Sequence, residues 1–327
     1  MTRQVFSTHP LHPLVTELLA KNSDYRVASE PTPDAILSEG LEAEVLVVRA
    51  PIPEDYFQRA ARLRAAVRHG AGLDMIPLGA ATRAGVIVAN APGANAQTVA
   101  EHVIFAAIAL LRQFRAVDGA LRQDGWGAAR LHADRGRDLS GRTLGILGMG
   151  NIGKALHRIA ANGFGMTVIA SSRRPEMLPD GVRAVDLDEL VSEAEVLVLC
   201  CPLTEATRGA ISGQRIALMK PGAVLINVSR GPVVDETALV AALANGTIAG
   251  AALDVFDTQP LPATHPLFAL RAALLTPHMA GITEDSMLRM GMTAAAEALR
   301  ILDGKLPLNF CNPEVEIRYR QRFPEQI

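Results

Sequence analysis

A glycine-rich turn between an apolar run and a helical pattern constrains this sequence more than any other stretch. The apolar run Leu144–Leu147 leads into Gly148-Met-Gly150-Asn-Ile-Gly153, a helical pattern follows, and a second apolar run covers 166–170. The first glycine permits the sharp turn, the second lets a pyrophosphate approach the backbone, and the third lets the helix pack closely on the strand. The stretch predicts a dinucleotide-binding unit, and a glycine turn that binds nothing is the alternative.

The helix expected after this turn would supply the groups that hold the phosphates. Its first N–H groups, at Asn151 and Ile152, have no partner inside the helix, and the helix dipole places partial positive charge there. We therefore expect a pyrophosphate at this helix start.

Length and composition exclude several classes of protein. The chain has 327 residues, which suits two domains of ordinary size, and its net charge of −2 offers no basic field for nucleic acid. The adjacent Cys200 and Cys201 lie in an apolar run, where they make a poor disulfide framework and fit a reducing cytoplasm. No apolar run reaches the length of a membrane span and no signal-type segment opens the chain, so we expect a cytoplasmic protein without a membrane partner. We expect no metal site.

Strand and helix patterns alternate along the chain, which indicates an α/β fold with doubly wound, mostly parallel sheets. The amphipathic pattern from Thr283 to Leu302 predicts a last helix that returns to the first part of the chain. We therefore expect a dinucleotide-binding domain at 98–285, inserted in a discontinuous substrate-binding domain made of 1–97 and 286–327.

The segment from Asp124 to Leu139 is polar, shows no regular pattern and carries the only tryptophan, Trp126. Loops this long are usually functional or interfacial. We expect an irregular loop here, with Trp126 as a packing anchor or as a contact across a dimer.

Three polar clusters stand at the ends of predicted strands after the glycine-rich turn, at 227–231, 254–260 and 276–281. In a doubly wound sheet such ends converge on the crevice beside the cofactor. Arg230 offers a planar fork to a carboxylate, and His278 has a pKa suited to exchanging one proton near neutrality. Each residue alone is equally well read as a surface arginine or a structural histidine, but together they indicate hydride transfer to a 2-keto acid.

Two further candidates follow predicted strands of the first domain. The N–H groups of the turn at Ala71 and Gly72 could hold a carboxylate, and a plain turn is an equal alternative. Arg49 follows an apolar strand and is about as well placed to face a substrate as to face solvent.

An ordered set of motifs resembles the D-isomer-specific 2-hydroxyacid dehydrogenase family over about residues 45 to 310. The motifs are His69-Gly-Ala-Gly-Leu-Asp74, Asn90-Ala-Pro-Gly-Ala-Asn95, Val99-Ala-Glu-His102, Gly148-Met-Gly-Asn-Ile-Gly153, Val228-Ser-Arg-Gly-Pro-Val-Val-Asp235, Gly250-Ala-Ala-Leu-Asp-Val-Phe256 and Thr276-Pro-His-Met-Ala-Gly281. The resemblance implies two Rossmann-like domains, a nicotinamide cofactor, an interdomain active site and a homodimer.

The resemblance also implies roles for residues that match the family motifs. Arg230 matches the arginine that grips the substrate carboxylate and carbonyl, His278 matches the proton donor, and the backbone at Ala71 and Gly72 matches a second carboxylate anchor. Asp254 matches the acid near the nicotinamide carboxamide. Other positions expected to line the cofactor are Pro202, Thr207, Val228, Ser229 and Gly281.

Gln259 stands where the family normally has a glutamate paired with the histidine. A carboxylate would raise the histidine pKa by its charge, whereas a neutral amide cannot, although its oxygen can still accept the ring N–H and fix the tautomer. We expect a working enzyme in which His278 titrates lower than in enzymes with the glutamate.

The expected ribose site also departs from the usual pattern. NAD sites carry an acid about twenty residues past the glycines, but here the strand ends in Ser172-Arg173-Arg174. These residues could bind a 2′-phosphate, which predicts that NADP(H) is preferred and NAD(H) is possible. Two surface arginines on a solvated loop are the alternative.

Two classes of function fit these residues. The first is a reductase of small 2-keto acids such as glyoxylate, hydroxypyruvate or a phenylpyruvate-like acid, with D-3-phosphoglycerate oxidation as a weaker option. The second is a dinucleotide-sensing binding protein like the family's transcriptional corepressors, which only Gln259 favours. The presence of both Arg230 and His278 favours the enzyme.

Overall fold

The computed structural model describes residues 3–324 and divides the chain into two compact units. The first unit joins the chain up to Asn95 with the chain from Ile282 onward, and the second runs from Ala96 to Gly281. Each unit holds one parallel β-sheet covered by helices, so the predicted α/β class with doubly wound sheets is confirmed.

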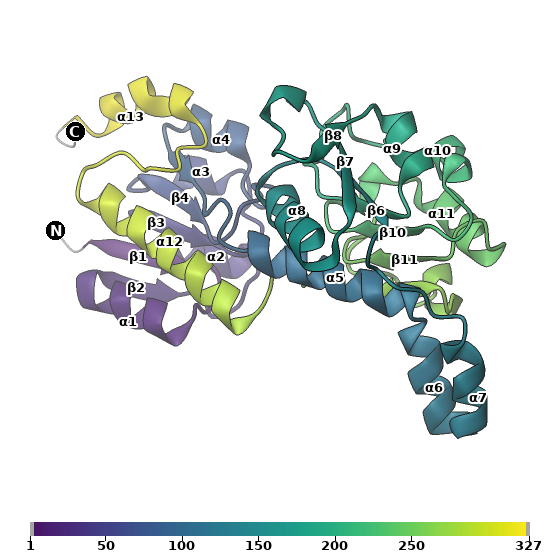
Figure 1. The fold of residues 1–327 in the computed structure, drawn as a ribbon. Coiled ribbons are helices and arrows are strands. Elements are labelled where there is room, and N and C mark those ends of the chain that lie inside the picture. Colours follow the sequence, from purple (N-terminus) through teal and green to yellow (C-terminus); the bar gives the residue numbers. More distant parts are fainter. Residues whose placement is uncertain (1–2, 325–327) are drawn as a thin grey trace. The chain divides into compact units, whose positions relative to one another are not determined.

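The first unit has five parallel strands in the order β2-β1-β3-β4-β5 (Figure 1). These strands are β1 (Gln4–Ser7), β2 (Asp24–Val27), β3 (Val45–Val48), β4 (Ala65–Arg68) and β5 (Ile87–Ala89). The helices are α1 (Pro13–Asn22), α2 (Pro33–Glu39), α3 (Tyr56–Arg59), α4 (Leu78–Arg83), α12 (Glu284–Leu302) and α13 (Glu316–Arg322), with a 3-10 turn η4 (Pro313–Val315).

Alternate residues of each strand in this sheet serve two separate cores. Leu46 and Val48 of β3 belong to the core beneath α2, α3 and α4, whereas Val45 and Val47 belong to the core beneath α1 and α12. This alternation explains why the central strand is apolar throughout, since both of its faces are buried.

The C-terminal part of the chain is fastened to this sheet by a buried amide. Asn312 accepts a hydrogen bond from the Val88 N–H (2.7 Å) and donates to the Val86 carbonyl (3.0 Å) and to the Thr82 hydroxyl (3.0 Å). The side chain is fully buried, so removing it would leave backbone groups of β5 unpaired.

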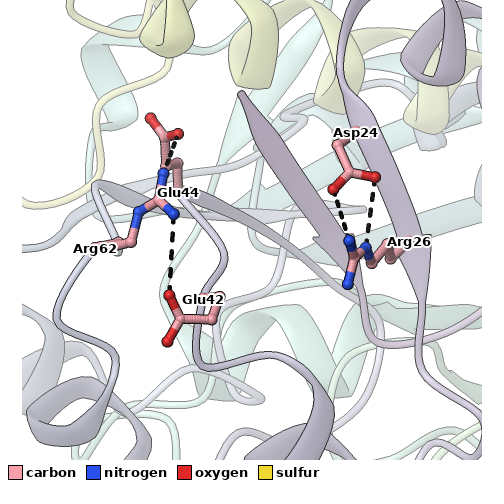
Figure 2. Close-up of polar contacts among 5 residues, drawn as sticks. All are labelled: Asp24, Arg26, Glu42, Glu44 and Arg62. Atoms are coloured by element: carbon pink, nitrogen blue, oxygen red, sulfur yellow. Dashed lines mark hydrogen bonds and ion pairs between the residues drawn. The ribbon is translucent and has the colours of Figure 1, made fainter. Parts of the chain in front are cut away.

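Charged residues at the amino ends of these strands form two contrasting groups of ion pairs (Figure 2). Glu44, which is 4% exposed, contacts Arg62 at 3.0 Å (Figure 2). It also contacts Arg64 at 2.6 Å. Asp24 and Arg26 pair at 2.9 Å on the surface of β2. Glu44 is buried and Arg64 nearly so, whereas Asp24 and Arg26 are open to solvent, so the two groups should differ in their effect on stability.

The second unit has seven parallel strands in the order β12-β11-β10-β9-β6-β7-β8. These are β6 (Thr143–Leu147), β7 (Thr167–Ser171), β8 (Val182–Ala184), β9 (Val196–Leu199), β10 (Val224–Asn227), β11 (Gly250–Leu253) and β12 (Ala273–Leu275). The helices are α5 (Ala96–Leu111), α6 (Phe114–Asp124), α7 (Trp126–Ala133), α8 (Asn151–Phe164), α9 (Leu187–Glu193), α10 (Gly213–Leu218) and α11 (Glu236–Ala244), with 3-10 turns η1 (Pro175–Met177), η2 (Gly231–Val233) and η3 (Pro266–Ala269).

The carboxyl ends of the strands in this sheet lie in one row. Leu147 of β6 is in register with Ser171 of β7 and Leu199 of β9, and the row continues through Asn227 of β10 to Leu253 of β11. The chain moves outward from β6 to β8 and then returns to β9 on the other side of β6, so the strand order reverses between β6 and β9. Ligands of doubly wound sheets bind at this reversal.

The segment 124–139 contradicts the expectation of an irregular loop. It contains α7, which packs against α6 as a helical hairpin beyond the end of α5 (Figure 1). Gly125 joins the two helices with φ 84°, a conformation that favours glycine. Trp126 is 74% exposed, so it is not a packing anchor within the chain. The sequence pattern predicts a helix at 117–123, within α6, but it misses α7, which is short and buries only Ala129.

The patterns also fail to indicate β1, α2 and α13, which are short or carry polar residues at their ends. Within residues 3–324, no helix has the length and apolar character needed to cross a membrane. The same residues contain no cluster of three histidine, cysteine or acidic side chains that could bind a metal ion.

Candidate active site

The glycine-rich turn has the geometry that its three glycines predict. Gly148 has φ 98°, and a Cβ there would lie 2.7 Å from the Cα of Cys201. A Cβ at Gly153 would lie 2.6 Å from the Gly148 carbonyl oxygen, so α8 starts directly against the turn. A Cβ at Gly150 would meet nothing within 4 Å, which leaves this side of the backbone open to a ligand. The turn therefore fits a pyrophosphate at the α8 N-terminus.

A cavity of about 520 Å³ opens beside this turn. Eight residues that the sequence marks as cofactor-binding line it: Gly148, Gly150, Asn151, Ser172, Arg173, Arg174, Pro202 and Thr207. Its described lining includes the cations Lys154, Arg173 and Arg174 and no carboxylate side chain. The cavity is therefore shaped and charged for an anionic ligand.

Six predicted cofactor residues are not in the lining of this cavity: Ile152, Gly153, Val228, Ser229, Asp254 and Gly281. Among the residues that sequence reasoning missed, Lys154 and Met149 belong to the glycine motif itself and could have been found from it. The cavity also has apolar lining residues that no local motif indicates, namely Met177, Leu187, Ala206 and Ala210.

The adjacent cysteines tie the glycine-rich turn to the neighbouring loop. The Cys200 thiol donates to the Gly148 carbonyl at 2.9 Å, and the Ser229 hydroxyl donates to the Cys201 carbonyl at 2.5 Å. Burial raises the pKa of both thiols. They therefore serve as packed thiols in the wall of the cavity and not as nucleophiles.

The loop after β10 holds Arg230 through a buried asparagine. Asn227 accepts from the Ser229 N–H and donates to the Arg230 carbonyl, both at 3.0 Å, and the Arg230 guanidinium donates to the Ser229 carbonyl at 2.6 Å. A Cβ at Gly231 would come within 2.0 Å of the Phe256 carbonyl carbon. Only glycine fits here, because the loops after β10 and β11 lie directly against each other.

Asp254 fixes the turn that carries His278. Its carboxylate accepts from the Thr276 hydroxyl (2.6 Å), the Met279 N–H (2.8 Å) and the Ala280 N–H (2.8 Å), and its carbonyl accepts from the His278 N–H (2.8 Å). The residue is 3% exposed, and His278 takes a left-handed φ of 55° in the turn. Both carboxylate oxygens are therefore engaged in shaping the backbone at His278.

The side chain of Gln259 reaches the ring of His278. Its Oε1 lies 3.2 Å from Nδ1, and an amide oxygen only accepts hydrogen bonds. The proton of this contact therefore sits on Nδ1, which leaves Nε2 as the ring atom that exchanges a proton with a substrate.

Asp257 lies close to Gln259 in the sequence, but the groups that shift the pKa of Asp257 do not include His278. Burial raises the pKa of Asp257, the charges of Glu236 and Asp235 raise it further, and the charge of Arg208 lowers it. The Asp257 N–H donates to Glu236 at 3.4 Å, and Glu236 also pairs with His265 at 3.1 Å. Asp257 thus belongs to a separate charged cluster.

His102 belongs to the sequence motif Val99-Ala-Glu-His102. It lies on α5, half-buried, where burial lowers its pKa and the charge of Asp254 raises it. His102 is therefore close enough to feel the charge of the carboxylate that shapes the His278 turn. No local spacing links residues 102 and 254, so only the fold reveals this neighbour.

In the first unit, Arg49 and the 70–72 turn both follow the carboxyl ends of adjacent strands, β3 and β4. The Arg49 guanidinium donates to the Pro10 carbonyl, and burial lowers the arginine pKa. The Thr8 hydroxyl accepts from the Arg49 N–H at 2.8 Å and so fixes the backbone there. Ala71 is exposed and Gly72 half-buried.

A parallel α/β sheet with a glycine-lined anion cavity at its reversal, and with an arginine after β10 and a histidine after β12 on the two sides of β11, defines a dinucleotide-dependent oxidoreductase. The family model for the NAD-binding domain of D-isomer specific 2-hydroxyacid dehydrogenases matches residues 104–280. The chain belongs to this family, as the motifs predict.

Three similar proteins cover nearly the whole chain. A glyoxylate reductase from Aeropyrum pernix is 38% identical over 97% of this chain and 98% of its own length. An NADPH-dependent glyoxylate/hydroxypyruvate reductase from Sinorhizobium meliloti, solved with NADP and malonate, has a TM-score of 0.82 at 26% identity over 95% of this chain and 97% of its own. An acyclic imino acid reductase, solved with NADPH and D-Arg, has a TM-score of 0.85 at 25% identity over 94% of this chain and 99% of its own.

These findings confirm three predictions made from the residues. The chain is an enzyme, it is an NAD(P)-dependent 2-hydroxyacid dehydrogenase, and it transfers a hydride with a nicotinamide dinucleotide as cofactor.

Proposed function

We propose that this enzyme is an NADP(H)-preferring reductase of small 2-keto acids. Arg230 binds the substrate carboxylate and carbonyl, His278 donates the proton, and the first unit supplies a second carboxylate anchor at Ala71 and Gly72, with Arg49 nearby. The observation that carries the proposal is the placement of the Arg230 and His278 loops on the adjoining strand ends of β10, β11 and β12.

The residues around His278 determine how it handles the proton. Gln259 accepts from Nδ1–H, so a protonated ring presents Nε2–H to the carbonyl oxygen of the substrate. The nicotinamide ring, when bound, supplies the hydride to the carbonyl carbon. As the oxygen gains charge, the Arg230 guanidinium stabilises it and Nε2–H protonates it. Asp254 keeps the ring in place by holding the backbone on both sides of it.

The preference for NADP(H) rests on the cavity lining. Ser172, Arg173 and Arg174 follow β7, and the described lining offers no carboxylate to repel a 2′-phosphate. The NADPH named for two structural neighbours is consistent with this cofactor. NAD(H) remains a usable alternative because the pyrophosphate site is common to both dinucleotides.

Comparing kcat/KM for NADPH and NADH tests this preference. We expect wild-type enzyme to favour NADPH, and an R173Q/R174Q double variant to lose NADPH efficiency by about tenfold or more while NADH efficiency changes little. Arg271, an exposed arginine outside the cavity lining, gives the control variant R271Q. An NADH advantage in the wild type would contradict the proposal.

Substrate screening with NADPH tests the acid class. We expect glyoxylate and hydroxypyruvate, the substrates named for the relatives, to be reduced. D-3-phosphoglycerate oxidation is the weaker option, although a relative from Methanocaldococcus jannaschii carries that name. Failure of every 2-keto acid would favour the dinucleotide-sensing alternative over the reductase.

The neutral partner of His278 favours imino acids as a second substrate class, and the structural neighbour named as an acyclic imino acid reductase supports it. An iminium carbon accepts hydride and becomes an amine without any proton from the enzyme. A reductase whose histidine has no carboxylate partner is therefore less handicapped on iminium substrates. Adding methylamine to a 2-keto acid assay should accelerate NADPH oxidation if this class is used, and should leave it unchanged otherwise.

We further propose a homodimer formed through α5, α6 and α7. These helices expose large apolar side chains: Phe105, Ile108, Phe114, Leu121, Trp126 and Leu131. Trp126 and Leu131 are both more than 70% exposed, and apolar groups gathered this way usually mark an interface. A second copy of the chain is the expected partner, and W126A/L131A should shift light scattering from dimer to monomer.

The cytoplasm is the proposed location, because Cys200, Cys201 and Cys311 are all unpaired thiols. Fractionation of cells expressing the tagged chain tests this. Recovery outside the cytoplasm would contradict it.

A further inference from the structure

The turn that follows β4 is held by the side chain of the strand's last residue. Arg68 Nη1 donates to the carbonyls of Val48 (2.9 Å) and His69 (2.6 Å), and Nε donates to the Gly72 carbonyl (3.0 Å). Gly70, with φ 140°, lies against the guanidinium, which a Cβ there would approach within 3.5 Å. One arginine fork therefore spans both ends of the turn.

The middle of the same turn is held from the neighbouring strand. The Asn90 side-chain amide donates to the Ala71 carbonyl at 2.8 Å, and the Ala91 N–H donates to the Gly70 carbonyl at 2.9 Å. Both donors come directly after β5. Together with the Arg68 contacts, four successive carbonyls from His69 to Gly72 have fixed donors.

These contacts determine where the N–H groups of the turn point. In a trans peptide the N–H points opposite to the carbonyl of the same unit. The N–H of Ala71 therefore points away from Ala91, and the N–H of Gly72 points away from Asn90. Ala71 is exposed, so these two donors face the accessible side of the turn, where two neighbouring N–H groups suit an anion.

We propose that Arg68 and Asn90 are positioning residues that aim the N–H groups of Ala71 and Gly72 at the substrate's carboxylate. This inference rests on the proposed 2-keto acid reductase and assigns the specificity of its anchor to two residues that do not touch the substrate. A lysine at 68 cannot replace the arginine, because one ammonium cannot span the carbonyls of His69 and Gly72 as the planar fork does.

Steady-state kinetics of R68M, R68K and N90A test this assignment. An anchor used equally by the bound substrate and the transition state raises KM when it is lost and leaves kcat nearly unchanged. We expect the KM for glyoxylate to rise about tenfold or more in R68M and N90A, with R68K close to R68M and the Kd for NADPH unchanged.

Two control variants remove an arginine and an asparagine that also donate to backbone carbonyls, but away from the 69–72 turn. Arg322 donates to the carbonyls of Ala84 (2.7 Å) and Ala60 (2.7 Å), and the Asn22 amide donates to the Leu18 carbonyl (2.8 Å), all in the first unit. R322M and N22A should keep the wild-type KM. Equal KM changes in variants and controls, or a wild-type KM in both R68M and N90A, would overturn the inference.

Binding of oxalate, a carboxylate probe that needs no turnover, separates this inference from the proposed function. If the wild type reduces no 2-keto acid, the proposed function fails, and calorimetry with oxalate then decides the positioning role alone. A Kd raised about tenfold in N90A but not in N22A supports the role. An unchanged Kd in N90A overturns it.

Discussion

Replacing Gln259 by glutamate should move the pH dependence of reduction toward alkaline pH. The substitution puts a carboxylate where Oε1 now lies 3.2 Å from His278 Nδ1. Above about pH 5 this carboxylate is ionised, and its charge favours the protonated ring. Reduction needs the protonated ring, so its rate falls as pH rises through the histidine pKa. A raised pKa therefore moves that fall to higher pH.

The expected size follows from the contact. Two unit charges about 4 Å apart at an effective dielectric constant near 20 interact by about 4 kcal/mol, which is an upper bound. The contact is exposed, however, and exposed pairs contribute about 1 kcal/mol or less. Since one pKa unit corresponds to about 1.4 kcal/mol, an interaction of about 1 kcal/mol or less shifts the pKa by at most about 0.7 unit, and we expect Q259E to shift the midpoint by about half a unit.

The assay is kcat/KM for glyoxylate reduction with NADPH across the pH range. The near-isosteric control Q259M has no acceptor for Nδ1–H, so it should lower the rate without an alkaline shift, because the ring loses its fixed tautomer. Identical profiles for wild type and Q259E would refute a working contact between these two side chains.

Three other variants probe stability and backbone geometry. Glu44→Ala should lower the free energy of unfolding by about 3 kcal/mol, because it removes the carboxylate that pairs with the largely buried Arg64. Asp24→Ala should lower it by less than about 1 kcal/mol, and urea titrations compare the two variants. Gly231→Ala should abolish reduction while NADPH binding survives in fluorescence titrations, since its Cβ meets the backbone of Phe256. Burial lowers the pKa of His69 from 6.5 to about 4, so the unfolded chain binds the proton first as the pH falls. The free energy of unfolding of the wild type should therefore fall by about 3 kcal/mol as the pH is lowered from 6.5 to 4. Urea titrations at both pH values should show a smaller fall in His69→Gln.

The sequence predicts those parts of the site that lie on regular strand ends. Apolar runs and glycines locate the ends of β6, β10 and β12, and parallel pairing then brings Gly148, Arg230 and His278 to one edge of the sheet. Register explains this success, because aligned strands place the following residues side by side wherever they stand in the sequence.

Other features depend on contacts that no pattern encodes. The matching acid of the family suggests a cofactor contact for Asp254, but its oxygens hold the turn at residues 276–280. The role of Arg68 and Asn90 cannot be predicted from the sequence, because it depends on hydrogen bonds to the carbonyls of Gly72 and Ala71 that only the fold brings within reach. Helix α7 escapes prediction because Ala129 is its only buried residue, so few of its side chains face a core.

Isotope transfer tests hydride transfer to the 2-keto acid, with His278 as the proton donor. NADPH carrying deuterium on the reactive carbon of its nicotinamide ring is mixed with glyoxylate and wild-type enzyme, and the product is examined by mass spectrometry. We expect a hydroxy acid with one deuterium on the former carbonyl carbon, formed at least about a hundredfold more slowly by His278→Ala at unchanged NADPH affinity. A product without deuterium, or His278→Ala enzyme as fast as the wild type, would contradict it.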